Sequence, residues 1–181
     1  MNIAVRGARP SDAVALSRLA AATFQETFAG ENTPDDIAVY VSGAFTPERQ
    51  AGDIADPAGV VLVAERSAES GDVELVGYAH LVDGKAPDAV IGPAPIELKR
   101  LYVARAWHGR RVAQALMDAA IAAAASRGAR TMWLGVWERN ARAVSFYAKY
   151  GLTRVGEHTF VLGADVQTDW LMSRPIDPPN L

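Results

Sequence analysis

The spacing of hydrophobic residues in the first third of the chain favours one strand followed by helices. Residues 3–5 form a short apolar run typical of a strand, and Pro10, Ser11 and Asp12 are residues that commonly begin a helix. Apolar side chains then recur at the spacing of one helical face, at Ala13, Leu16, Leu19, Ala20 and Phe24. Between residues 30 and 57 the pattern is interrupted by Pro34, Gly43, Pro47 and Gly52. This part of the sequence therefore predicts shorter helical pieces joined by turns.

The pattern changes to strand-like runs after residue 59. Residues 60–64 and 73–82 are apolar runs separated by a polar segment, so we expect two antiparallel neighbouring strands. Residues 86–95 carry several prolines and glycines and predict a loop. Residues 96–103 again have strand composition.

The middle of the chain predicts a helix, a strand and a second helix after the strand at 96–103. The first helix ends at Arg127 and Gly128, and its apolar face consists of Val112, Ala113, Leu116, Met117, Ala120, Ile121 and Ala124. Residues 131–137 form the next strand-like run, and Asn140 is well suited to cap a helix that ends before Gly151. Residues 155–162 and 168–174 predict two closing strands.

Composition excludes several classes of protein. The chain has 181 residues, 50% hydrophobic and 22% charged, so we expect one folded domain over residues 1–175 with a tail at 176–181. A formal net charge of −3 provides no basic field for nucleic acid, and no apolar run is long enough to span a membrane. Without cysteine, and with His80, His108 and His158 far apart, we expect no metal site. These features, with no leader-like start, predict a cytoplasmic protein without nucleic-acid or membrane partners.

A turn rich in cations joins the strand at 96–103 to the helix that follows. It contains Arg105, Arg110 and Arg111, immediately before the first amides of the helix. Such amides lack intrahelical partners and lie at the positive end of the helix dipole, so they bind anions. On composition alone, the arginines could equally be ordinary solvated surface charges.

The same segment resembles the acetyl-CoA-binding motif of the GNAT superfamily, a strand L-x-V followed by Q/R-x-x-G-x-G/A at the start of a long helix. Leu101 and Val103 match the strand, and Gly109 and Ala113 match the loop. His108 stands where Gln or Arg is usual. Arg111 stands where the middle glycine is usual, so it restricts the backbone but could also add a phosphate contact.

A second block, residues 133–152, looks like the family's N-x-x-A-x-x-F-Y-x-x-x-G-F pattern, with Leu152 in place of the final aromatic. More narrowly, residues 97–103, 137–138 and 163–169 resemble PaiA-type polyamine N-acetyltransferases. The resemblance implies an α/β three-layer sandwich whose central mixed, mostly antiparallel sheet splays between its fourth and fifth strands. It also implies acetyl-CoA as acyl donor, held by Leu101, Tyr102, Val103, His108, Gly109, Arg110, Arg111, Val112, Ala113 and Asn140.

Catalytic roles follow from the resemblance and from acid–base chemistry. Tyr147 could give a proton to the departing thiolate, and Glu97 is the leading candidate to take a proton from the amine. Glu138 or a water is an alternative base. Tyr147 could instead be a packing residue, and Glu97 could form an ordinary salt bridge. By family analogy, Phe24, Phe28, Trp137 and Glu138 line the acceptor pocket, although both phenylalanines also fit a plain core role.

The predicted activity is direct transfer of an acetyl group to a primary amine, without an acyl-enzyme. Acidic residues that could face the acceptor, Glu26, Glu31, Glu97 and Glu138, favour a small cationic amine such as a polyamine. A peptide or protein amine is the alternative acceptor, and a catalytically silent acyl-CoA sensor is the alternative class. An exposed sheet edge would also permit a homodimer.

Overall fold

The structure is a computed structural model that describes residues 3–30, 33–67, 73–162 and 165–177. Within these residues seven strands form one sheet in the order β1-β2-β3-β4-β5-β7-β6. They are β1 (Ile3–Gly7), β2 (Gly59–Ser67), β3 (Val73–Asp83), β4 (Pro95–Val103), β5 (Thr131–Trp137), β6 (Thr153–Leu162) and β7 (Asp165–Pro175). Neighbours are antiparallel except β4 and β5, which are parallel. The mixed, mostly antiparallel sheet predicted from the sequence is confirmed.

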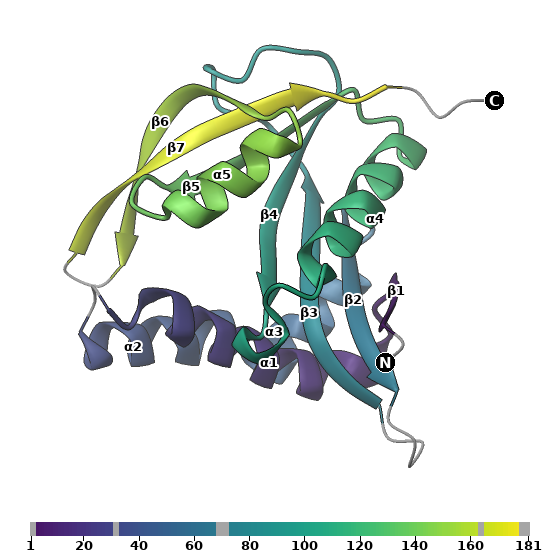
Figure 1. The fold of residues 1–181 in the computed structure, drawn as a ribbon, viewed down its shortest axis with the longest axis vertical. Helices are drawn as coiled ribbons and strands as arrows, with labels where there is room; N and C mark the ends of the chain where they lie inside the picture. The colour runs from purple at the N-terminus through teal and green to yellow at the C-terminus, as the bar shows by residue number, and fades with distance from the viewer. Residues whose placement is uncertain (1–2, 31–32, 68–72, 163–164, 178–181) are drawn as a thin grey trace.

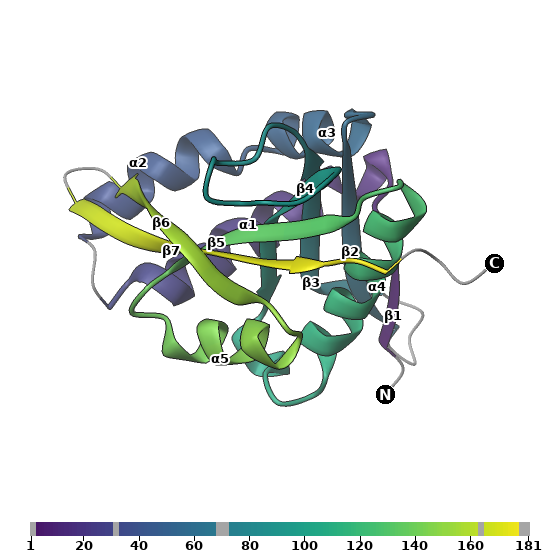
Figure 2. The same cartoon turned by 90° about the horizontal axis from the view of Figure 1, so that it is seen from above.

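Helices cover both faces of this sheet (Figures 1 and 2). On one face lie α1 (Ala13–Phe28), α2 (Pro34–Ala44) and α3 (Pro47–Ala55), and on the other lie α4 (Val112–Ser126) and α5 (Ala141–Lys149). Two short 3₁₀ turns, η1 (Pro10–Asp12) and η2 (Arg105–Trp107), precede α1 and α4. In the described part of the chain, no helix is long and apolar enough to cross a membrane.

The segment between residues 33 and 55 forms two helices whose starts are encoded locally. Pro34 and Pro47 occupy the first turns, where a missing N–H costs nothing, and they follow capping threonines. The hydroxyl of Thr33 accepts a bond from the Asp36 amide at 3.2 Å, and that of Thr46 from the Arg49 amide at 3.1 Å. The two glycines expected to interrupt this region, Gly43 and Gly52, instead lie inside α2 and α3. The prolines therefore begin helices, and the glycines do not end them.

Alternation along the central strands divides the apolar residues between two cores. Ile96, Leu98, Leu101 and Val103 of β4 pack on the side of α4 and α5. Tyr102 of β4 packs on the side of α1, α2 and α3. Glu97 lies between Ile96 and Leu98 and therefore faces the α1–α3 side.

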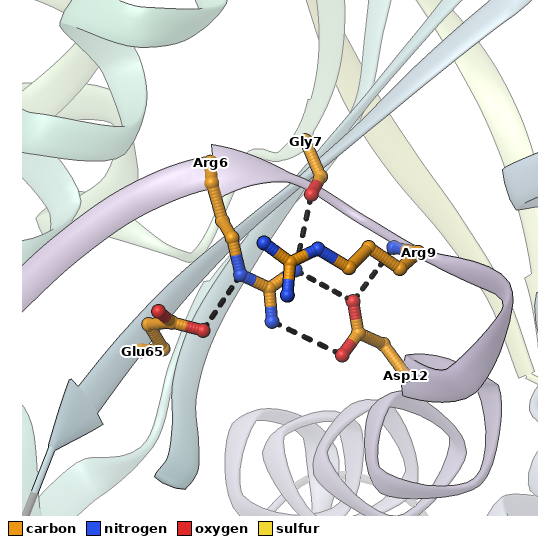
Figure 3. Close-up of polar contacts among 5 residues, drawn as sticks. All are labelled: Arg6, Gly7, Arg9, Asp12 and Glu65. Carbon is orange, nitrogen blue, oxygen red and sulfur yellow. Dashed lines mark hydrogen bonds and ion pairs between the residues drawn. The ribbon is translucent and has the colours of Figure 1, made fainter.

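An arginine joins the first strand to the beginning of the first helix (Figure 3). Nη1 and Nη2 of Arg6 donate to the two carboxylate oxygens of Asp12 at 2.7 and 3.1 Å, and Nε donates to Glu65 at 2.7 Å. Asp12 also accepts a bond from the Arg9 amide at 2.7 Å. The hydrogen bond from Arg6 lowers the pKa of the Asp12 carboxyl, against the effect of burial. These bonds fix the position of η1 beside the β1–β2 edge.

Candidate active site

The two parallel strands in the middle of the sheet part soon after they begin. Only Pro95, Ile96 and Glu97 of β4 pair with β5, although β4 continues to Val103 and β5 to Trp137. Glu97, opposite Trp133, is the last paired position. The predicted splay between the fourth and fifth strands is thus present, and Figure 1 shows β4 and β5 diverging beside α5.

Beyond the splay, β4 leads directly through the cationic turn into α4. Two residues of this turn have left-handed backbones: Gly109 at φ 77° and Arg111 at φ 62°. Arg111 takes the conformation that favours glycine, which explains the glycine usual at this place in the resembled motif. Its carbonyl accepts the Ala115 amide at 3.0 Å and so helps to form the first turn of the helix.

The amino terminus of α4 differs from those of α2, α3 and α5 because no side chain caps it. In those three helices Thr33, Thr46 and Asn140 supply the cap. The first amides of α4, around Val112 and Ala113, therefore have no intrahelical acceptor and no capping side chain to bond to. With the arginines of the turn exposed beside it, this helix start has the charge and donors of an anion site.

His108 connects the turn to two other elements. One ring nitrogen, Nε2, lies 2.8 Å from the Val103 carbonyl, and Nδ1 lies 2.8 Å from Nη1 of Arg142 on α5. Because a guanidinium can only donate, Nδ1 accepts and Nε2–H donates to the carbonyl. His108 thus ties the end of β4 to the start of α5. Arg110 lies over the ring of Trp107, 5.2 Å from its centroid.

The second block supplies a capped helix with a buried phenol. Oδ1 of Asn140 accepts the Ala143 amide at 3.1 Å, so Asn140 caps α5 as the sequence predicts. Tyr147 is buried in the core shared with α4, and burial raises the pKa of its phenol. Burial raises the pKa of Tyr102 as well, and the neighbouring Tyr147 adds to that effect. The two phenols are therefore near one another at the splay.

Glu97 lies on the opposite face of the sheet from the core that contains Tyr147. Burial raises the pKa of its carboxyl, and the nearby charges of Lys99, His158 and Arg100 oppose that rise. A carboxyl in such a setting is a weaker acid than usual and a better proton acceptor at neutral pH.

Three of the predicted acceptor residues form one aromatic cluster, in which Phe28 contacts both Phe24 and Trp137, and the fourth, Glu138, is not part of it. Phe28 of α1 packs on Trp137 at the end of β5, with ring centroids 5.8 Å apart. Phe24 is 3% exposed and stacks on Tyr40 at 4.6 Å, so it belongs to the core. Glu138 is exposed beyond the end of β5.

Glu26 and Glu31 are the other two acidic residues that were predicted to face the acceptor. Glu26 accepts the backbone amide of Arg105 at 3.2 Å, which joins α1 to the turn after β4. Glu31 lies outside the described residues, as do residues 163–164 of the segment that resembles PaiA-type enzymes.

Two residues to which the sequence assigned no catalytic role, His158 and Asp169, lie on the same side of the sheet as Glu97. Asp169 is the last residue of the segment 163–169 that resembles PaiA-type enzymes. Nε2 of His158 on β6 is 3.7 Å from Oδ2 of Asp169 on β7. Burial raises the pKa of Asp169, and the adjacent His158 opposes that rise. Phe160, two residues along β6 from His158, packs on the α1–α3 side, so His158 faces the same side as Glu97. The alternation of side chains along β6 could have predicted that His158 lies on this face. That His158 lies near β4 depends on the order of the strands in the sheet.

Comparison with known proteins gives one consistent result. The model of the family described as "Acetyltransferase (GNAT) family" matches residues 21–152. An uncharacterised N-acetyltransferase of Lactobacillus delbrueckii subsp. lactis is 33% identical over 163 residues, 90% of this chain and 90% of that protein. An uncharacterised N-acetyltransferase of Mycobacterium tuberculosis is 37% identical over 166 residues, 92% of this chain and 99% of that protein.

A solved structure has the same fold. The PaiA N-acetyltransferase of Thermoplasma acidophilum in complex with coenzyme A superposes with a TM-score of 0.73 over 97% of this chain and 99% of that one. The two sequences are 22% identical, so this likeness concerns the fold alone.

Proposed function

The chain belongs to the GNAT family of acetyltransferases, and from this premise we propose that it transfers the acetyl group of acetyl-CoA to the primary amine of a small cationic acceptor. A polyamine is the first acceptor to test. The donor would be acetyl-CoA because the solved PaiA structure with the same fold is a complex with coenzyme A.

One observation carries this proposal: the splay between β4 and β5 opens onto the uncapped start of α4. A pantetheine arm is long, narrow and able to hydrogen-bond. Leu101 to Val103 pair with β3 on one edge of β4, and the opposite edge, which no longer pairs with β5, offers the arm hydrogen-bond partners. The pyrophosphate would then meet the amides of Val112 and Ala113 beside Gly109, Arg110 and Arg111. His108 and Asn140 would support this site by holding the turn and α5 in place.

The chemistry divides between the two faces of the sheet. The amine nitrogen would bond to the thioester carbonyl carbon, and the carbon–sulfur bond would break with its electron pair on sulfur. Tyr147, on the α4–α5 side, would give its proton to that sulfur, since a phenol is protonated at neutral pH and burial raises its pKa further. Glu97, on the other side, would receive the ammonium group of the acceptor. Holding the amine and thioester together supplies much of the rate enhancement.

The charge near the splay favours a cationic acceptor. Burial raises the carboxyl pKa values of both Glu97 and Asp169, so water does not fully stabilise the negative charge of either carboxylate. An ammonium group would supply the missing positive charge. The aromatic pair of Phe28 and Trp137 would pack on the methylene groups of such an amine.

The test is thiol release from acetyl-CoA with a panel of amines. The panel contains spermidine, spermine, free lysine and a peptide with a free N-terminus. We expect turnover with spermidine or spermine well above that with the peptide. Robust turnover of the peptide alone would assign a peptide acceptor, and CoA binding without turnover of any amine would favour a silent acyl-CoA-binding domain.

A further inference from the structure

The imidazole of His158 on β6 lies close to Gly135 of β5, where the absence of a side chain leaves room for it. In the sheet, β5 and β7 separate β4 from β6. A Cβ added at Gly135 of β5 would lie 3.2 Å from Nε2 of His158 and 3.5 Å from Oδ2 of Asp169. Gly135 is two residues beyond Trp133, the last residue of β5 that pairs with β4. The imidazole therefore lies across β5 at the point where β4 and β5 part.

The imidazole and the carboxylate of Asp169 form a pair in which one group can orient the other. Their 3.7 Å separation is within ion-pair reach and longer than a hydrogen bond. Hydrogen bonds of this kind are often long without substrate and shorten in the complex. With Nε2–H directed to Asp169, the other ring nitrogen, Nδ1, is left as a proton acceptor.

The exposure of the two side chains suits these roles. The side chain of His158 is 40% exposed and that of Asp169 is 15% exposed. Oδ1 of Asp169 is buried and has no hydrogen-bond partner within the described residues. A buried carboxylate with an unused oxygen stabilises a neighbouring imidazolium, and the exposed imidazole can return its proton to water.

We propose that His158, oriented by Asp169, is the general base that takes the proton from the acceptor amine, while Glu97 holds the ammonium group beside it. The proposal rests on the acetyl transfer proposed above. His158 takes one proton from the ammonium ion, and the neutral amine bonds to the carbonyl carbon as the carbon–sulfur bond breaks. The sulfur takes the proton of Tyr147, and the second amine proton is lost to water. Tyr147 regains a proton from water, so the products are the amide, the CoA thiol and one proton.

Several titratable and charged groups surround this base. Asp169 faces His158 from β7, and Glu97 faces it from β4. Glu97 is in turn influenced by Lys99 and Arg100, and Tyr102 lies near Asp169. A helix also packs here, because the ring of Tyr40 on α2 lies 6.1 Å from that of Phe160 on β6.

The test compares His158→Ala, Asp169→Asn and Glu97→Gln with wild type in the spermidine reaction, as kcat and KM across pH. We expect His158→Ala to lower kcat about 10²-fold or more and to leave KM for spermidine and CoA affinity nearly unchanged. Added imidazole should restore kcat in proportion to its unprotonated form. Asp169→Asn should lower kcat and alter its pH profile, because the imidazole loses its orientation. Glu97→Gln should mainly raise KM.

Glu157→Gln is the matched control, because Glu157 is the exposed neighbour of His158 on β6 and pairs with Arg154 at 2.6 Å. It should leave kcat at the wild-type value. The proposal is overturned if His158→Ala stays within about threefold of wild type at every pH, or if its loss resists imidazole and leaves the pH profile unchanged. A wild-type protein that binds CoA but acetylates no amine would instead refute the proposed function itself.

Discussion

Replacing Arg111 by glycine should make the protein more stable, although the arginine lies in a surface turn. Arg111 is the residue immediately before α4, with φ 62° and ψ 14°. A side chain in this left-handed region brings Cβ close to the backbone, at a cost of about 1–2 kcal/mol. Glycine adopts the same conformation without that cost.

The expected magnitude follows from two opposing terms. Removing Cβ recovers about 1–2 kcal/mol of strain in the folded state, and the freer unfolded chain of glycine offsets about 0.4–1 kcal/mol of it. The midpoints of these two ranges leave a net gain of about 0.8 kcal/mol. For a chain of this length, that gain corresponds to an increase in Tm of about 1–4 °C.

Thermal and urea unfolding followed by circular dichroism would measure the change, with Arg111→Ala as the matched variant. Alanine removes the guanidinium but keeps Cβ, so Arg111→Ala should be no more stable than wild type. Gly109→Ala should be less stable by about 0.8 kcal/mol, because a Cβ at φ 77° adds backbone strain that the stiffer unfolded chain only partly offsets. The added Cβ meets open space, so no steric clash adds to this cost. If Arg111→Gly and Arg111→Ala have equal stability, backbone strain at this position is not the cause. A loss of CoA affinity common to both would report on the guanidinium.

Three other predictions concern the acid, the phosphate site and the β1–η1 junction. Tyr147→Phe should lower single-turnover acetyl transfer by about 10²–10⁴-fold without altering CoA affinity. Because burial raises the pKa of Tyr147, any loss of wild-type rate from its ionisation should appear only above about pH 10. CoA should raise Tm, and Arg110→Glu should weaken calorimetric binding of CoA more than that of dephosphorylated pantetheine. Asp12→Asn should lower the free energy of unfolding at pH 7 by about 1.5–3 kcal/mol, because a hydrogen-bonded charge is lost. Since Arg6 lowers the pKa of Asp12, this difference should be full above the unfolded pKa of about 3.9 and shrink as pH falls through the lower folded pKa.

Each of these predictions has a contradicting result. Wild-type single-turnover rates for Tyr147→Phe at every pH would make the tyrosine a packing residue. Equal losses of CoA and pantetheine in Arg110→Glu would remove the arginine from the phosphate site. A constant stability difference between wild type and Asp12→Asn from pH 7 to pH 2 would show that the carboxylate charge does not stabilise the junction.

The elements that could be predicted from the sequence are those encoded by neighbouring residues. The apolar face that begins at Ala13 specifies α1, and Asn140 specifies the start of α5 through its own side chain. The role of glycine was less predictable, because a glycine inside a helix and a glycine that ends one look alike in sequence. Gly43 and Gly52 were expected to interrupt the helical pattern and instead lie inside α2 and α3, whereas Pro34 and Pro47 mark where these helices begin.

The part of the candidate site that could be predicted from the sequence lies on β4 and α4, which follow one another in the chain. Glu97 and the turn before α4 lie within one contiguous stretch, and the strained backbone of Arg111 coincides with its departure from the resembled motif. His158 and Asp169 were not predictable, because their approach to Glu97 requires the order of four strands and the missing side chain of Gly135. No local pattern in the sequence contains that information.

The central claim is direct transfer of an acetyl group from acetyl-CoA to an amine at the splay between β4 and β5. The most direct measurement is a quenched single-turnover reaction of the protein with acetyl-CoA and spermidine, followed by mass spectrometry of both the amine and the intact protein. We predict one acetyl group on the amine, one equivalent of CoA thiol, and no acetylated protein at any time point. An acetylated protein that forms before the acetylated amine and then decays, or an amine that remains unmodified while CoA binds, would contradict the account.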